Sequence, residues 1–228
     1  MRKIVRNLFS FKEAKLPARK GSQKSKAQSL VEFAITLPIL ILLLTGMIEF
    51  GFMLNTYLSV QDATRTMARR YSTINPFDTN GAINPVFFQD ASQYAIELLA
   101  PSGDPASRQI VMDPTRDNIL ISLIGVDVDE STDPDSIQLI QRLTGGDYYK
   151  HFGDTNPPSI YPNERIEELM TANGAEPSDS GLLIVEVYYG YEGTLNLPWT
   201  RPFFSPGNPS MLYISVVMPT IYAKPFDF

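Results

Sequence analysis

The chain has 228 residues, a net charge of −6 and no cysteine. The lack of cysteine excludes disulfides, thiolate metal sites and cysteine nucleophiles. The overall acidity says little about nucleic acid because the charge is unevenly distributed: residues 1–27 carry nine Lys/Arg and one acid, whereas residues 55–228 carry ten Lys/Arg and 22 acids.

The most apolar part of the chain follows this basic leader. Leu30–Leu54 is a run of 25 predominantly apolar residues, and about 20 suffice to cross a hydrocarbon layer of about 30 Å. A cleaved secretory signal would have an apolar region of about 7–15 residues ending in small residues, whereas Glu49 and Phe50 follow the uncharged run here. The sequence therefore predicts a single-pass protein of the cell (inner) membrane, in contact with membrane lipid.

The charges on the two flanks predict the orientation of this span. Six Lys/Arg lie between Lys12 and Lys26, against Arg65, Arg69 and Arg70 on the other side. Because Lys/Arg near a span are retained on the cytoplasmic side, we expect a cytoplasmic N-terminus and an extracytoplasmic C-terminal domain. A basic arm can also contact RNA or DNA, but a topogenic leader explains residues 1–27 more simply, so no nucleic-acid partner is expected.

Residues 28–72 are predicted to form one helix that leaves the membrane without a break. Helical spacing of apolar residues continues past Leu54, and no proline occurs between Leu54 and Pro76. From about Ser29 to Tyr71 this helix would be roughly 65 Å long. The outer half of this helix has a less apolar face than the span, and this face should pack against the acidic domain or against another subunit.

Two carboxylates, Glu32 and Glu49, interrupt the apolar run. An ionisable side chain within a span is costly and indicates a function by default. Their separation of about 25 Å along a helix places them near opposite membrane faces, so the alternative is that each reaches lipid headgroups. The functional interpretation is favoured for both, and most for Glu32 because of its neighbours.

The segment Ala27-Gln28-Ser29-Leu30-Val31-Glu32-Phe33-Ala34 resembles a class III prepilin processing site. It is most similar to the TadE-like proteins of tight-adherence (type IVc, Flp) pilus systems. The family pattern is a small residue, usually Gly, then the scissile bond, with Glu at the fifth mature position and Phe or Tyr after it. Glu32 is fifth counting from Gln28, Phe33 follows it, and Ala27 stands in the place of Gly.

This resemblance implies a minor pilin or pseudopilin that takes part in pilus assembly for adhesion or secretion. A prepilin peptidase would cut between Ala27 and Gln28. Glu32, with Phe33, would align the subunit by pairing with the new N-terminal amine of its own chain or a neighbour. The implied partners are that peptidase, other pilins and pilus assembly proteins. The alternative is a permanently anchored envelope protein whose outer domain binds a partner or ligand.

Residues 73–228 are predicted to form an α+β domain with a small, mainly antiparallel sheet, covered on one face by the long N-terminal helix. Apolar spacing and turn residues predict its elements. The expected helices are 85–100, 134–143 and 163–173, and the expected strands are 109–112, 118–128, 182–190 and 213–218.

Catalytic chemistry has little support in this domain. No Gly-x-Ser-x-Gly elbow and no phosphate-binding glycine loop occurs, so no enzyme activity, cofactor or small-molecule substrate is expected. The lone His151 is expected at the surface. The acidic run Asp127–Asp135 could bind Ca²⁺, but it lacks the EF-hand pattern, and a solvated loop is the preferred interpretation. The aromatic residues Trp199, Phe203 and Phe204 are expected to pack in the core.

Overall fold

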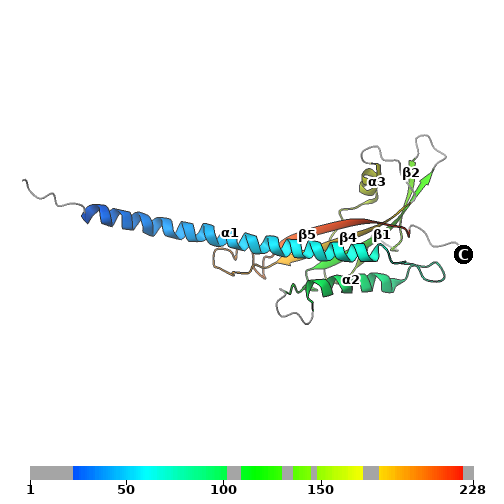
Figure 1. The fold of residues 1–228 in the computed structure, drawn as a ribbon, viewed down its shortest axis with the longest axis horizontal. Helices are drawn as coiled ribbons and strands as arrows, with labels where there is room; N and C mark the ends of the chain where they lie inside the picture. The colour runs from blue at the N-terminus through cyan, green and yellow to red at the C-terminus, as the bar shows by residue number, and fades with distance from the viewer. Residues whose placement is uncertain (1–22, 102–108, 130–135, 145–147, 172–179, 223–228) are drawn as a thin grey trace, which may run out of the picture. The chain divides into compact units, whose positions relative to one another are not determined.

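A computed structural model describes residues 23–101, 109–129, 136–144, 148–171 and 180–222. Residue contacts divide the chain into two units, Met1–Leu44 and Thr45–Phe228. The elements of the described residues are three helices and five strands (Figure 1), in the order α1 (Gln23–Tyr71), α2 (Pro85–Leu99), β1 (Asn118–Asp129), β2 (Ser136–Arg142), β3 (Tyr149–Lys150), α3 (Asn163–Thr171), β4 (Ser180–Tyr191) and β5 (Ser210–Thr220).

Helix α1 begins in the first unit and ends in the second. It continues through Pro38 without a break in its assignment, which agrees with the predicted continuous helix. From Ala27 to Leu44 every side chain is exposed, and within the described residues α1 is the one helix long and apolar enough to cross a membrane. A helix that is apolar on all sides suits lipid rather than water, so the protein has the features of a single-pass membrane anchor.

From Thr45 onward, one face of α1 becomes buried in the second unit. The buried positions recur every three or four residues, as the 3.6-residue helical period requires; they are Glu49, Thr56, Val60, Ala63, Thr64, Met67, Ala68 and Tyr71. The expectation that the outer half of the helix rests an apolar face on the domain is therefore confirmed.

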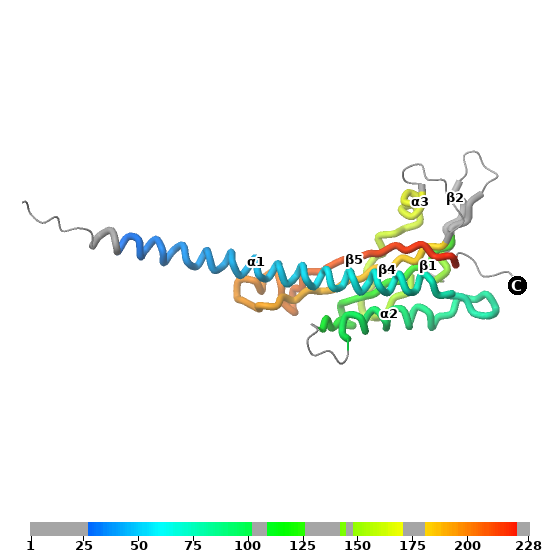
Figure 2. The backbone as a smooth tube through the Cα atoms, in the orientation of Figure 1, coloured from blue at the N-terminus to red at the C-terminus, as the bar shows by residue number. Residues whose placement is uncertain are grey.

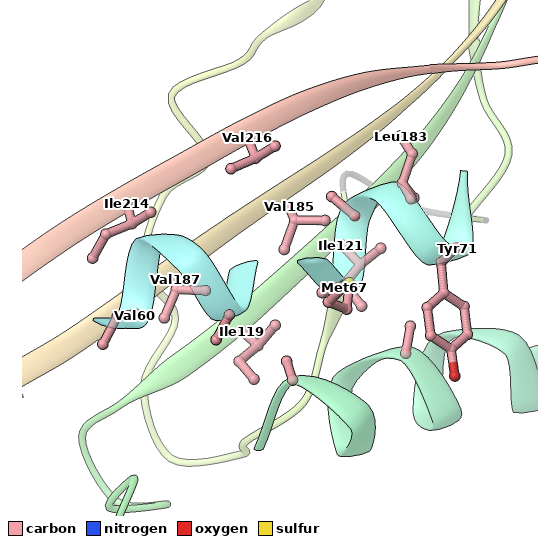
Figure 3. Close-up of a cluster of buried hydrophobic side chains, with 14 of the residues drawn as sticks. Val60, Met67, Tyr71, Ile119, Ile121, Leu183, Val185, Val187, Ile214 and Val216 are labelled. Carbon is pink, nitrogen blue, oxygen red and sulfur yellow. The ribbon is translucent and has the colours of Figure 1, made fainter. Parts of the chain in front are cut away.

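The second unit contains an antiparallel sheet in the strand order β2-β1-β4-β5, with β3 also paired to β1. Its fold is α+β, as predicted. Alternate side chains along each strand point to the same face, and one face carries apolar residues that pack with Val60 and Met67 of α1 (Figure 3). These sheet residues are Ile119, Ile121, Leu123, Leu183, Val185, Val187, Ile214 and Val216.

Helix α2 completes the cover of this face beside α1 (Figure 1). The side chain of Asn84 caps its first turn by accepting a hydrogen bond from the Val86 N–H at 3.0 Å, and Pro85 occupies the first helical position. Phe87 packs edge-on against Tyr71 of α1, with 5.4 Å between the ring centroids. The predicted helix 85–100 is confirmed.

The opposite face of the sheet is also partly covered. Ile166 of α3 is buried against Ile124 and Ile184. On the same face Glu186 is fully buried, and its carboxylate accepts hydrogen bonds from the Ser159 hydroxyl at 2.5 Å, the Ile160 N–H at 3.0 Å and the Tyr213 hydroxyl at 2.7 Å. The N-terminal helix thus covers one face of the sheet, as predicted, and α3 partly covers the other.

Two of the predicted elements are wrong. Residues 109–112 do not form a strand, because the Ile110 N–H donates to the carbonyl of Leu99 rather than to a neighbouring strand. Residues 136–142 form β2, not part of a helix, because they pair with residues 124–129 of β1. The strands predicted at 118–128, 182–190 and 213–218 are confirmed and are slightly longer. The helix predicted at 163–173 is α3, and its last two residues lie outside the described residues.

His151 was expected at the surface, but the structure places it in a partly buried position. It is half-buried, and its Nδ1 lies 2.7 Å from the Ser92 hydroxyl of α2. Burial lowers the pKa of the His151 imidazole, because desolvation disfavours the charged form.

This burial predicts a pH dependence of stability. The unfolded chain has a His pKa of about 6.5 and takes up its proton before the folded chain does. The free energy of unfolding should therefore fall as the pH drops from about 7 through the lowered folded-state pKa. Urea unfolding of the full chain in detergent at about pH 7.5 and about pH 5.5 measures this. His151→Asn should make the dependence weaker; an unchanged pH slope in that variant would contradict the assignment.

Candidate functional site

The residues predicted for processing and alignment lie together at the beginning of the exposed part of α1. Ala27, Gln28, Glu32 and Phe33 are all exposed. The Gln28 side-chain amide donates to the Glu32 carboxylate at 3.2 Å, because positions four apart are neighbours on a helix. The main-chain carbonyl of Glu32 accepts a hydrogen bond from the Thr36 hydroxyl at 2.9 Å. The carboxylate of Glu32 is thus one helical turn from Gln28.

Glu49 lies in a different environment, inside the second unit. Its side chain is fully buried. Its carboxylate accepts hydrogen bonds from the hydroxyl of Tyr191, the last residue of β4, at 2.6 Å, and from the Thr194 N–H at 2.5 Å and the Leu195 N–H at 2.8 Å in the chain that follows β4. A buried carboxylate is costly unless donors satisfy it, and these three donors do so. Glu49 therefore fastens residues 192–209, named here the aromatic loop, to α1. Figure 2 shows the backbone of this loop beside α1.

The local sequence explains why the aromatic loop can present two successive N–H groups to one carboxylate. Gly193 has a φ of 84°, a left-handed conformation that favours glycine. A Cβ at Gly193 would lie 2.9 Å from the Phe204 Cβ and 3.3 Å from a Glu49 carboxylate oxygen. The close approach of the loop to Glu49 therefore requires glycine there. Consecutive N–H groups in such a turn form a concave site that suits an anion.

The aromatic side chains of this loop differ from expectation. Phe204 is half-buried and packs edge-on against Tyr191, with 5.6 Å between ring centroids. Trp199 and Phe203 are instead 41% and 65% exposed, so the prediction that they pack in the core is wrong. The Trp199 indole N–H donates to the Thr45 hydroxyl of α1 at 3.0 Å. This contact holds the edge of the indole on the helix and leaves much of the ring uncovered.

A further group of charged residues lies around Arg116. Arg116 pairs with Asp117 at 2.9 Å and with Glu192, and these hydrogen bonds raise the pKa of its guanidinium although burial opposes them. It lines a cavity of about 520 Å³ with Thr56 and neighbouring residues. Among the described residues no group of three His, Cys, Asp or Glu could hold a metal ion. Most of the run Asp127–Asp135 lies outside the described residues.

An α1 helix that is exposed and apolar in one unit and packed on an α+β sheet in the other defines a class: single-span, membrane-anchored α+β proteins. Residues 27–69 match the family model of TadE-like protein, so this segment is TadE-like and the resemblance seen at Ala27–Ala34 is confirmed. Comparison with curated proteins and with solved structures gives no match. The match of this segment points to a function related to the Tad pilus.

Sequence reasoning singled out Glu49 but missed all of its partners. Tyr191, Thr194 and Leu195 lie more than 140 residues further along the chain, and two of them contribute main-chain N–H groups. The one available signal was the carboxylate itself, because an acid within an apolar run requires donors from somewhere.

Proposed function

We propose that this protein is a TadE-like minor pilin or pseudopilin that takes part in assembly of a tight-adherence pilus. Its leader would stay in the cytoplasm and its α+β domain would be extracytoplasmic. The observation that carries this proposal is the exposed Glu32, the fifth residue counting from Gln28 and the only acid in the stretch 27–44 of α1, which is exposed throughout and mostly apolar. A carboxylate in that position gains most from a partner with a positive charge.

The distance along the helix supports the amine of Gln28 as that partner. Cleavage after Ala27 would create an ammonium group at the residue whose side chain already reaches the Glu32 carboxylate. Opposite charges attract strongly at low dielectric, and an unpaired one is penalised. A carboxylate of an incoming subunit could equally pair with the amine of a neighbour, which would align the two chains at the same depth.

Processing at Ala27 gives the first test of the proposal. Because a peptidase needs a small residue before the scissile bond, Ala27→Gly should keep or improve cleavage, whereas Ala27→Leu should block it. The mature N-terminus is determined by N-terminal sequencing, and mobility is compared on gels in cells with and without the prepilin peptidase. We expect Gln28 as the first residue of the wild-type protein only where the peptidase is present.

A permanently anchored envelope protein would give a different result. Its chain would keep Met1 at the N-terminus in both strains, and neither Ala27 variant would change its mobility. Identical mobility of all forms with and without the peptidase would therefore refute processing and leave the anchor as the remaining function.

A further inference from the structure

The aromatic loop exposes two large apolar side chains, and one of them contacts α1. Trp199 and Phe203 are 41% and 65% exposed, and the Trp199 indole N–H donates to Thr45. Thr45 and Glu49, which accept hydrogen bonds from the loop, are also the first positions at which α1 loses exposure. The loop therefore lies where the helix stops being exposed on all sides.

The length of the fully exposed part of α1 indicates where the outer edge of the hydrocarbon layer would lie along the helix. Residues 27–44 are exposed throughout and include one acid, Glu32. Eighteen helical residues span about 27 Å, close to the hydrocarbon thickness of about 30 Å. Lys24 and Lys26 precede this stretch in the sequence and suit its cytoplasmic edge. The outer edge of the hydrocarbon then falls near Thr45, the residue that holds the Trp199 indole.

We propose that the aromatic loop is a lipid-contacting surface seated in the headgroup layer of the membrane. Trp and Tyr are enriched at this level of membrane proteins because their rings are apolar and their polar edges need a partner. The Thr45 hydroxyl already satisfies the Trp199 N–H, so the exposed remainder of the ring can meet lipid. Arg201 is exposed in the same loop and can pair with a lipid phosphate.

The attachment of the loop makes this surface rigid. The Thr194 and Leu195 N–H groups fix the loop to the buried Glu49 of α1, and the packing of Phe204 on Tyr191 fixes it to the end of β4. Trp199 and Phe203 cannot move independently of α1. Their contact with lipid would therefore fix the depth of α1 in the bilayer. The inference goes beyond the proposed pilin function: it requires only that α1 spans a membrane, and it holds equally for a permanently anchored protein.

Trp199 is the only tryptophan of the chain, so its native fluorescence reports on this surface. The full chain is reconstituted in vesicles of phosphatidylethanolamine and phosphatidylglycerol that carry a quencher at the headgroup, in the middle of the acyl chain or at its end. Iodide, loaded on both sides of the vesicles, probes exposure to water. We expect the headgroup-level quencher to act most strongly and iodide to act weakly.

One variant and one control sharpen the result. Phe203→Asp should at least halve quenching by the headgroup-level lipid, because a charge next to Trp199 draws the loop toward water. Ile160→Asp is the matched control: Ile160 is exposed in a different loop, and its replacement should leave the quenching of Trp199 unchanged.

Three results would overturn the inference. Strong quenching by iodide with none by lipid would place the loop in water. Strongest quenching by the end-of-chain label would place it in the hydrocarbon. Lipid quenching that disappears as the protein-to-lipid ratio rises would show that a second copy covers the surface. Each of these leaves the cleavage test at Ala27 unaffected.

Discussion

We expect Glu49→Leu to lower the free energy of unfolding of the second unit by about 3 kcal/mol or more. The reason is that the Tyr191 hydroxyl and the Thr194 and Leu195 N–H groups would lose a shared acceptor, and each unsatisfied buried donor costs about 1–3 kcal/mol. For a unit of this size the melting temperature should fall by roughly 10 °C. Thermal unfolding of the full chain in detergent, followed by circular dichroism, measures the effect.

Graded variants separate the lost acceptor from other effects at Glu49. Tyr191→Phe removes one donor and leaves two, so it should cost about 1 kcal/mol. Glu97→Gln, at an exposed position of α2, should change the free energy of unfolding by less than about 0.5 kcal/mol. A melting temperature for Glu49→Leu equal to that of Glu97→Gln would show that Glu49 does not fasten the aromatic loop.

The long helix was predictable because its signal is local. A 25-residue apolar run followed by helical spacing admits few structures, and no proline interrupts the segment between Pro38 and Pro76. The strands β1, β4 and β5 were predictable for a similar reason, since runs of Val, Ile and Leu between turn residues are typical of buried strands.

The elements that sequence reasoning missed depend on distant partners. Asp133-Pro134 before residues 136–142 and Gly145-Gly146 after them imitate the start and stop signals of a helix, yet pairing with β1 makes this segment a strand. Residues 109–112 show the opposite error. Ile110 and Met112 are buried while Val111 is 70% exposed, which is the alternation of a strand, but no described strand pairs with them.

The two carboxylates of α1 illustrate the same limit at the candidate site. A role for Glu32 could be proposed from neighbouring residues, because its proposed partner is four residues away. The surroundings of Glu49 could not, because its donors come from the far end of β4 and depend on the positive φ of Gly193. The exposure of Trp199 and Phe203 was missed for a related reason, since aromatic residues in a proline-rich connection usually pack inside.

We expect Glu32→Gln to leave membrane insertion and cleavage intact and to reduce incorporation into pili by at least about tenfold, equivalent to about 1.4 kcal/mol. Insertion should survive because the span becomes more apolar and the basic leader is unchanged. Incorporation should fall because glutamine keeps the size and hydrogen-bonding capacity of the side chain but cannot attract an amine by charge. The membrane-bound and sheared-pilus fractions of each variant are measured by immunoblot.

The controls for Glu32 follow from the structure. Glu49→Gln is unsuitable because Glu49 is buried in the folded unit and its replacement would disturb the domain. Asp62→Asn removes an equal charge from an exposed position of the same helix and should enter pili normally. Glu32→Asp keeps the charge and should restore part of the incorporation, since only one methylene of reach is lost. Pili that contain Glu32→Gln at the wild-type level would refute the pairing role, because the charge would then contribute nothing to assembly.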